Sequence, residues 1–216
     1  MQPDWVWIKH RNGTGHHVFT DSVRGATKEL RANASDDEST AAEGLQAFQT
    51  DGYLLGDNNG DYNRDTRTYV GWNWKAGTSF SNDASSTGVG TIDSTGSINT
   101  TAGCSIISYT GTGSNGTIAH GLGAVPRWII VKVRDASNNW VVQHGSLGAT
   151  KRLLLDGTQA EASASTFFNN TDPTSSVFSV GTEDITNNSG NAYIAYCFAE
   201  KQGYSKFGSY TGNGNA

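Results

Sequence analysis

The chain has 216 residues, a formal net charge of -5 at pH 7, 27 glycines, only 3 prolines and 16% charged residues. This acidic balance offers no basic surface for phosphate groups, so nucleic acid is not expected as a partner. No apolar run reaches the roughly 18 residues needed to span a bilayer, and the first residues lack the basic and apolar regions of a signal peptide. The composition indicates a soluble, mostly β chain without membrane insertion.

Residues 1–75 alternate between short apolar runs and polar turn signals. β-Branched and aromatic residues predict strands at residues 5–9, 16–19, 53–56 and 69–74, separated by Asn-Gly, Asp-Gly and other polar turns. In the last of these runs, alternation places Trp72 and Trp74 on one face of the strand. We define residues 1–75 as the first of two β repeats.

Residues 76–103 are dominated by Gly, Ser, Thr, Asn and Asp, with single apolar residues scattered among them. This composition is typical of a linker, here with one edge strand at most.

Residues 104–203 repeat the organisation of the first segment. Four positions recur at a constant offset of 123: Pro3, Trp5, Lys9 and Arg11 match Pro126, Trp128, Lys132 and Arg134. Residues 25–28 recur as residues 148–151, and the run at 69–74 corresponds to residues 193–198 after one inserted residue. The second repeat also has a leading strand, expected at residues 104–110, which the first repeat lacks.

Residues 204–216 contain the sequence Ser-Tyr-Thr-Gly at 209–212, which also occurs at 108–111 in the leading strand of the second repeat. Because sheets rarely leave long apolar edges open, we expect this C-terminal strand to complete the first repeat, either within the chain or in a neighbouring protomer.

The pattern of short strands predicts an all-β chain. Two arrangements stay open: two related β-sandwiches in tandem, or one pseudo-symmetric sandwich made from two related halves. The two cysteines, Cys104 and Cys197, lie in apolar runs and are expected to be buried free thiols, since two cysteines are too few for a disulfide scaffold.

None of the five histidines lies in a known catalytic motif, so no catalytic residue is named and no enzyme is predicted. His17 and His144 lie in strands that we match between the repeats. An aligned pair of this kind is more often structural, but it could also face a ligand.

The polar loop at residues 57–63 places oxygen ligands at alternate positions, on Asp57, Asn59, Asp61 and Asn63. This spacing resembles the opening of a calcium loop, but the glycine and the distal Glu of such loops are out of register. A solvated turn rich in Asn and Asp is the simpler interpretation, with Ca²⁺ as the alternative and no other cofactor expected. Tyr62 and Arg64 in this loop are the candidates for an exposed ligand site.

Residues 120–126, His-Gly-Leu-Gly-Ala-Val-Pro, form a glycine turn locked onto the start of an apolar strand. The motif His-x-Leu-Gly-x-x-Pro is similar to one that recurs in bacteriophage tail-fibre and other virion proteins. Residues 128–134 together with 193–214 resemble a repeat of uncharacterised structural proteins from marine and other environmental phages. The first repeat departs from this family because it lacks the His-x-Leu-Gly turn.

The resemblance implies a jelly-roll, concanavalin-like or laminin-G-like sandwich, located in the virion surface or tail. It also implies partners among other virion proteins or further copies of the chain, and a host cell-surface glycan as a candidate ligand. Three functions follow: a non-enzymatic virion structural protein that assembles and attaches to the host, a lectin-like glycan-binding module, or a polysaccharide-degrading enzyme. We favour the first, because the chain is duplicated and contains no catalytic motif.

Overall fold

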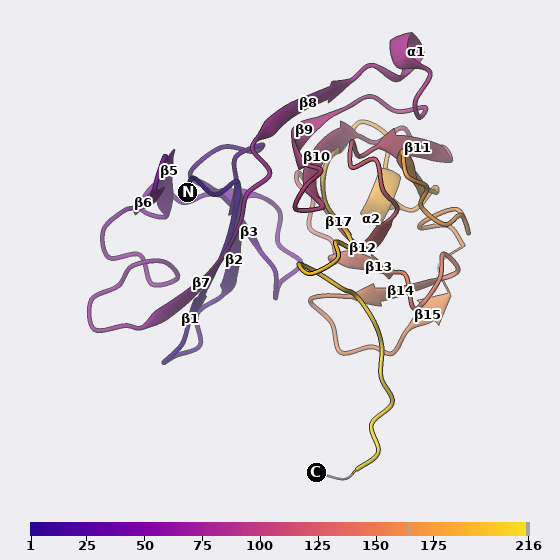
Figure 1. Ribbon diagram of the computed structural model, residues 1–216. Helices are drawn as coiled ribbons and strands as arrows, with labels where there is room; N and C mark the ends of the chain where they lie inside the picture. Colours follow the sequence, from indigo (N-terminus) through magenta and orange to yellow (C-terminus); the bar gives the residue numbers. More distant parts are fainter. Residues whose placement is uncertain (164, 215–216) are drawn as a thin grey trace.

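The computed structural model describes residues 1–163 and 165–214, and they are nearly all strand and loop (Figure 1). Both helices in this part of the chain are single turns, α1 (Ala84–Thr87) and α2 (Asp184–Asn187). No helix among the described residues has the length and apolar character required to cross a membrane. The prediction of an all-β chain is confirmed.

The first sheet is antiparallel, with strand order β4-β3-β2-β1-β7. Its strands are β1 (Trp5–His10), β2 (His17–Asp21), β3 (Lys28–Arg31), β4 (Ser39–Thr40) and β7 (Tyr69–Trp74). Both faces of β1 are covered: alternation points Trp5 to one face and Val6 and Ile8 to the other, and all three are buried. This explains why the run at its start is continuously apolar.

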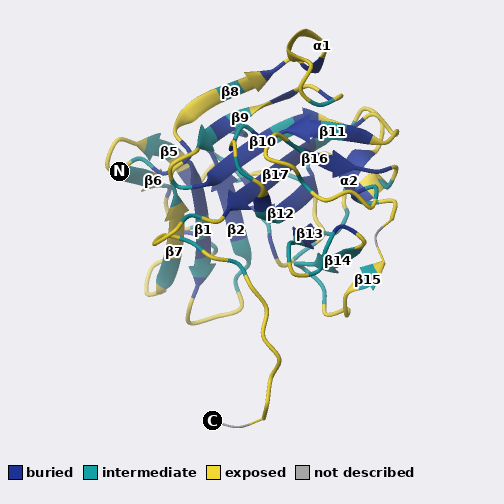
Figure 2. Ribbon diagram, turned by 45° about the vertical axis from the view of Figure 1, so that its right-hand side comes forward, coloured by how far each residue is buried: buried dark blue, intermediate teal, exposed yellow. Residues whose placement is uncertain are grey.

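The second sheet is also antiparallel, with strand order β15-β14-β13-β12-β17-β10-β9-β8. Its strands are β8 (Thr78–Asn82), β9 (Ser94–Asn99), β10 (Cys104–Thr110), β12 (Pro126–Val133), β13 (Val141–His144), β14 (Lys151–Leu154), β15 (Ala162–Ser163) and β17 (Ala192–Ala199). Buried residues are concentrated in β10, β12 and β17 at its centre (Figure 2).

The two sheets share strand order and pairing register over five strands, since β15-β14-β13-β12-β17 follows the same order as β4-β3-β2-β1-β7. Trp5 lies opposite Asp21 and Trp74, and 123 or 124 positions later Trp128 lies opposite His144 and Phe198. The sheets differ beyond this point: β17 pairs with β10 on its other side, whereas β7 ends the first sheet.

The prediction that residues 76–103 form a linker is wrong. They contain β8 and β9, which extend the second sheet beyond β10. The composition is misleading here because Gly96 lies where the backbone of β10 approaches closely, and any side chain at this position would overlap the Ile106 carbonyl. The glycine is therefore a packing requirement of a strand.

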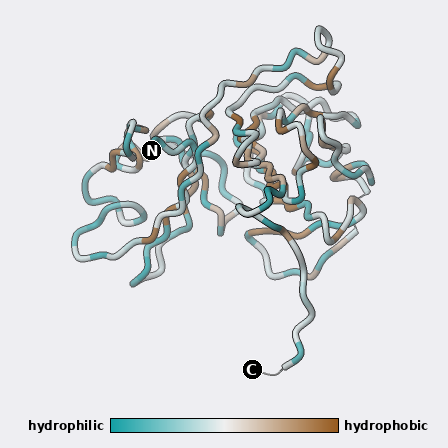
Figure 3. The backbone as a smooth tube through the Cα atoms, viewed as in Figure 1, coloured by the Kyte–Doolittle hydropathy of each residue, from teal (hydrophilic) through white to brown (hydrophobic). Residues whose placement is uncertain are grey.

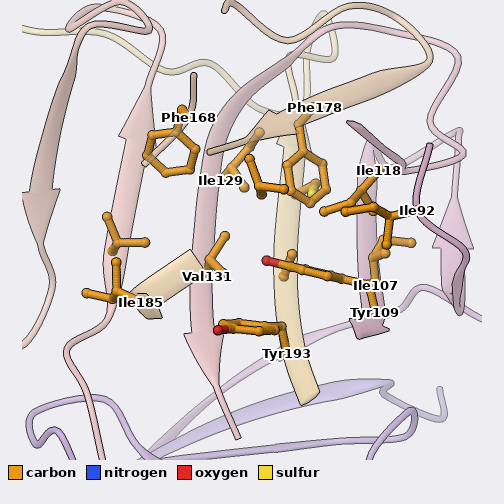
Figure 4. Close-up of a cluster of buried hydrophobic side chains, with 14 of the residues drawn as sticks. Ile92, Ile107, Tyr109, Ile118, Ile129, Val131, Phe168, Phe178, Ile185 and Tyr193 are labelled. Atoms are coloured by element: carbon orange, nitrogen blue, oxygen red, sulfur yellow. The ribbon is translucent and has the colours of Figure 1, made fainter. Parts of the chain in front are cut away.

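Two small two-stranded sheets cover the outer faces of the large sheets. The pair β5 (Leu45–Gln49) and β6 (Gly52–Leu55) lies over the first sheet, where Leu45 packs with Val6, Ile8 and Val18. The pair β11 (Gly116–Ala119) and β16 (Val177–Val180) lies over the second sheet, around a core that includes stacked Tyr109 and Tyr193 rings (Figure 4).

An aromatic layer joins the inner faces of the two sheets. Trp5 and Phe19 of the first sheet form one buried cluster with Trp140 and Tyr196 of the second. The Trp5 and Tyr196 rings stack with centroids 4.5 Å apart, and the Phe19 ring meets the edge of Trp140 at 5.1 Å. The two sheets are therefore the layers of one β-sandwich with a shared interior.

A buried polar network crosses the same interface. The Arg24 Nε donates to Asp21 Oδ2 at 2.6 Å, and the Tyr196 hydroxyl donates to the same oxygen at 2.7 Å. Burial alone would lower the pKa of Arg24, but the Asp21 carboxylate beside it raises the pKa above its usual value. At the rim, Arg134 forms a bidentate pair with Glu38 across the two halves.

Replacing Asp21 with Asn leaves the Arg24 guanidinium buried without its main counter-charge, so we expect a loss of about 3–5 kcal/mol in the free energy of unfolding. Asp36→Asn is the matched control, because the Asp36 carboxylate and Arg31 form an exposed pair that contributes about 1 kcal/mol or less. Urea unfolding of both variants measures the difference. Equal losses for the two variants would contradict this account of the network.

The Lys132 side chain is fully buried near the junction of the halves. Its ammonium donates to the carbonyls of Val133, Ala136 and, from the other half, Ser35. Burial lowers the pKa of Lys132 to about 8, although nearby aspartates oppose the shift. The folded chain therefore releases this proton at lower pH than the unfolded chain, and stability rises with pH between the two pKa values.

The stability difference between wild type and Lys132→Met should therefore move in favour of wild type as the pH rises from 7 to 9.5, by about 1–2 kcal/mol. Comparing the two proteins cancels titrations that both share, including those of buried tyrosines. Chemical denaturation at four pH values measures the change. A difference that stays constant over this range would show that Lys132 keeps an ordinary pKa when folded.

The prediction of buried free thiols is confirmed, since Cys104 and Cys197 are both buried and unpaired. Burial raises the pKa of Cys104 to about 11 and that of Cys197 to about 12. Neither thiol is activated as a nucleophile, because only the thiolate reacts.

Candidate functional site

The loop at residues 57–63 joins β6 to β7 and lies at the hydrophilic left-hand margin of the molecule (Figure 3). Asn59 Oδ1 accepts from the Asp61 backbone N–H at 3.0 Å, and Asp61 Oδ1 accepts from the His16 backbone N–H at 2.8 Å. The Asn63 amide donates to the Gly56 carbonyl. These bonds make a turn that is tied to the connection between β1 and β2.

These contacts engage two of the four proposed calcium ligands, Asn59 and Asp61, through their side-chain oxygens. Within residues 1–163 and 165–214, no group of three or more His, Cys, Asp or Glu side chains is placed to hold a metal ion. The solvated turn accounts for the observed bonds, and a calcium site at Asp57, Asn59, Asp61 and Asn63 stays a prediction.

The expectation that Tyr62 is exposed is wrong. Its side chain is only 2% exposed and packs with Val6, Ile8, Val18 and Leu45 beneath the loop. Its hydroxyl is hydrogen-bonded to the Thr20 hydroxyl at 3.1 Å, and burial raises its pKa above the usual value. The outer face of the first sheet needs an apolar cover, and Tyr62 supplies part of it.

Arg64 is exposed as expected and lines a cleft of about 330 Å³. His10, Asp61 and Arg67 line the same cleft, and an Arg67 guanidinium nitrogen lies 3.4 Å from His10 Nε2. Two guanidinium groups against one carboxylate favour an anionic ligand. Arg67 was not predicted from the sequence, although its position three residues after Arg64 in one polar loop was a usable signal.

The prediction that His17 and His144 occupy matching positions in the two repeats is wrong. The register places His144 where the first sheet has Asp21, and His17 where the second sheet has Trp140. His17 accepts a hydrogen bond from the Trp7 indole, and its pKa is lowered by burial and by Lys9 and His16. His144 accepts from the Ser146 backbone N–H. Each histidine has a local structural contact.

The open edge of β7 is the largest difference between the two sheets. Among the described residues no strand pairs with the outer side of β7, and Trp72 on this strand is 42% exposed. The sequence of β7, Tyr-Val-Gly-Trp-Asn-Trp, contains no charged residue and no proline. Charged side chains and prolines are common features that protect the edge strands of sheets. Because β7 has neither, its edge is open to another strand.

Hydrogen bonding identifies the backbone groups at this edge. The backbone N–H groups of Arg11 and Asp4, just beyond the two ends of β1, donate to the carbonyls of Thr68 and Trp74. Along an antiparallel strand, the N–H and C=O groups of successive residues point to opposite sides. Since those of Thr68 and Trp74 face β1, the groups of Tyr69, Gly71 and Asn73 point outward. Their counterparts in β17 are Tyr193, Ala195 and Cys197, which pair with β10.

Residues 206–214 form no strand and extend away from both sheets (Figure 1). Phe207 still packs against Trp128 and Phe198, whereas Tyr210 is 95% exposed. The tail therefore does not complete the first sheet within the chain, and that version of the prediction is wrong for the described residues. Addition to a neighbouring protomer stays a prediction.

One protein-family model matches residues 1–216, which is the whole chain. The chain belongs to the family described as Domain of unknown function (DUF7483). The match runs through both sheets. No curated protein and no solved structure matches this DUF7483 chain.

The calcium prediction for this DUF7483 chain is tested by its thermal stability. Because Asn59 and Asp61 oxygens already accept hydrogen bonds in the loop, we expect the Tm in millimolar Ca²⁺ to equal the Tm in EDTA. The control variant is Asp57→Asn, which removes the one exposed carboxylate among the four proposed calcium ligands. A rise in Tm with Ca²⁺ that Asp57→Asn abolishes would establish the site instead.

Proposed function

We propose that this chain is a non-enzymatic structural protein of a bacteriophage virion, of the tail-fibre or surface type, which works by assembly and by attachment to the host. The observation that carries the proposal is the open edge of β7. The resemblance of residues 193–214 to structural proteins of environmental phages supports the virion location.

An open, uncharged edge favours assembly for a physical reason. Each outward N–H and C=O of Tyr69, Gly71 and Asn73 gains a partner when a strand is added, and the exposed Trp72 side chain gains a neighbour. In a chain that stays monomeric, the same edge is a liability for uncontrolled pairing. Its retention is therefore better explained by a specific occupant.

The occupant that fits best is the segment at residues 205–211 of a second copy. It aligns with β10 at an offset of 101, where Ser209, Tyr210 and Thr211 repeat Ser108, Tyr109 and Thr110. β10 pairs with β17, and β7 occupies the position in the first sheet that β17 occupies in the second. The pairing of β10 with β17 therefore predicts which residues of the added strand lie opposite which residues of β7. Tyr210 would lie opposite Tyr69, as Tyr109 lies opposite Tyr193.

The Tyr109–Tyr193 pair shows the contribution of this position. Their rings stack with centroids 5.1 Å apart and planes 10° apart. Cross-strand aromatic pairs contribute up to about 1 kcal/mol beyond backbone pairing. Tyr210 is free to move to such a partner because it has almost no contact with its own chain.

Two variants separate the edge from its occupant. Asn73→Pro removes an outward N–H while leaving the pairing of β7 with β1, and Asn73→Ala is its matched control. A chain ending at residue 207 lacks most of the occupant segment, including Ser209, Tyr210 and Thr211, but keeps the Phe207 contacts. At about 100 μM, above the micromolar Kd expected for a short added strand, light scattering should find oligomers for wild type and Asn73→Ala only.

Mixing the two defective proteins provides the decisive measurement. Asn73→Pro still carries the tail, and the shortened chain still carries the edge, so together they should form a heterodimer and nothing larger. A wild-type chain that is monomeric at this concentration, or oligomers that survive both changes, would sink the proposal.

A further inference from the structure

A second, smaller cleft lies at the end of the second sheet where β12 begins and β13 ends. Its volume is about 170 Å³, and its walls come from three separate parts of the chain: residues 125–129, residues 143–148 and residues 172–173. It shares no residue with the loop cleft around Arg64 or with the edge of β7.

Gln143 lines this cleft and is the unusual residue in it. The side chain is 3% exposed, yet neither Nε2 nor Oε1 has a hydrogen-bond partner among the described residues. A buried amide without partners destabilises a fold, because it loses its bonds to water and gains none in return. A donor and an acceptor therefore remain unused at the wall of a cleft.

Two charged side chains of opposite sign line the same cleft as this amide. Arg127 and Asp172 both line the cleft, and neither forms an ion pair in the described part of the chain. The Arg127 guanidinium lies against Gly145, where a Cβ would overlap it, so the glycine provides the space for this side chain. The rest of the wall is apolar, from Pro126, Ile129 and Pro173.

We propose that this cleft binds one neutral sugar residue of a glycan. Its volume of about 170 Å³ is below the roughly 300–1,000 Å³ of pockets for drug-sized ligands, so the cleft is limited to a single small ring such as a pyranose. The charges of Arg127 and Asp172 cancel, so neither an anion nor a cation gains from the site as a whole. An amide, a guanidinium and a carboxylate between apolar walls match the alternating hydroxyl and C–H surfaces of a sugar.

The site goes beyond assembly through β7 and does not depend on it. Protein-observed NMR on the full chain tests it, with the Gln143 side-chain NH₂ signal assigned by its loss in Gln143→Met. The probes are the methyl glycosides of glucose, galactose, mannose and N-acetylglucosamine, with glucuronate and glucosamine as charged controls.

At least one methyl glycoside should shift the Gln143 NH₂ signal saturably, with a Kd in the millimolar range. Arg127→Met and Asp172→Asn should each weaken binding by at least about fivefold, the loss expected for one hydrogen bond. The charged controls should bind more weakly by a similar factor. Asn73→Pro should leave binding unchanged, which separates this site from the β7 edge.

Without sugar, Gln143→Met should raise the Tm by about 2–4 °C, because it removes an unpartnered buried amide and keeps the volume of the side chain. A lower Tm would mean that Gln143 is already satisfied by the protein, and the site would be withdrawn. The absence of any saturable shift at Gln143 with all four methyl glycosides would likewise overturn it.

Discussion

The burial of aromatic rings between the two sheets is the constraint on which the rest of the structure depends. Trp5 contacts Phe19 and Trp74 in its own sheet and Tyr196 and Phe198 in the other. Rings of this size bury 150–250 Å² each, so the layer supplies much of the apolar area that holds the sandwich together. Asp21 and Arg24 lie within the same interface, and their mutual pairing makes their burial tolerable.

The shared interior explains why the outer surfaces of the two halves are free to differ. Both inner faces are fixed by the same packing requirement, and the strand order and register are the same over five strands. Beyond β17 the second sheet continues through β10, β9 and β8, whereas the first sheet stops at β7. Among the described residues, the unpaired edge thus follows from unequal strand number on equal scaffolds, and it is the edge at which we propose an intermolecular contact.

Much of the fold could be predicted from the sequence. The apolar runs and turn signals gave the central strands, and the constant offset of 123 anticipated that Trp5 and Trp128 occupy comparable strands. The prediction failed where a neighbour decides the role of a residue. Gly96 lies in the segment predicted as a linker, but the close approach of the β10 backbone requires it in a strand. Tyr62 was expected to be exposed in a polar loop, but the first sheet needs it as a cover.

The candidate sites were harder to predict, because a site depends on side-chain partners that no spacing rule reports. His17 and His144 were matched by the similarity of short runs, whereas the pairing register separates them by four positions. Arg64 was named correctly as exposed, but Arg67 and His10 join it only because the loop folds back onto the turn after β1. Gln143 gave no signal at all, since a glutamine in a strand is unremarkable until its partners are known.

A comparison of equivalent positions shows why Gln143 stands alone. The register places Thr20 of the first sheet at the position of Gln143 in the second. Thr20 is hydrogen-bonded to Tyr62, which the loop before β7 brings over the sheet. The loop before β17 contains α2 instead, and its Thr186 hydroxyl donates to the Phe167 carbonyl. One half therefore closes this position with a tyrosine, while the other keeps a longer amide, an adjacent cleft and two charges that form no ion pair among the described residues. The same pairing register is therefore compatible with a satisfied hydroxyl in the first sheet and with an amide that the fold does not use in the second.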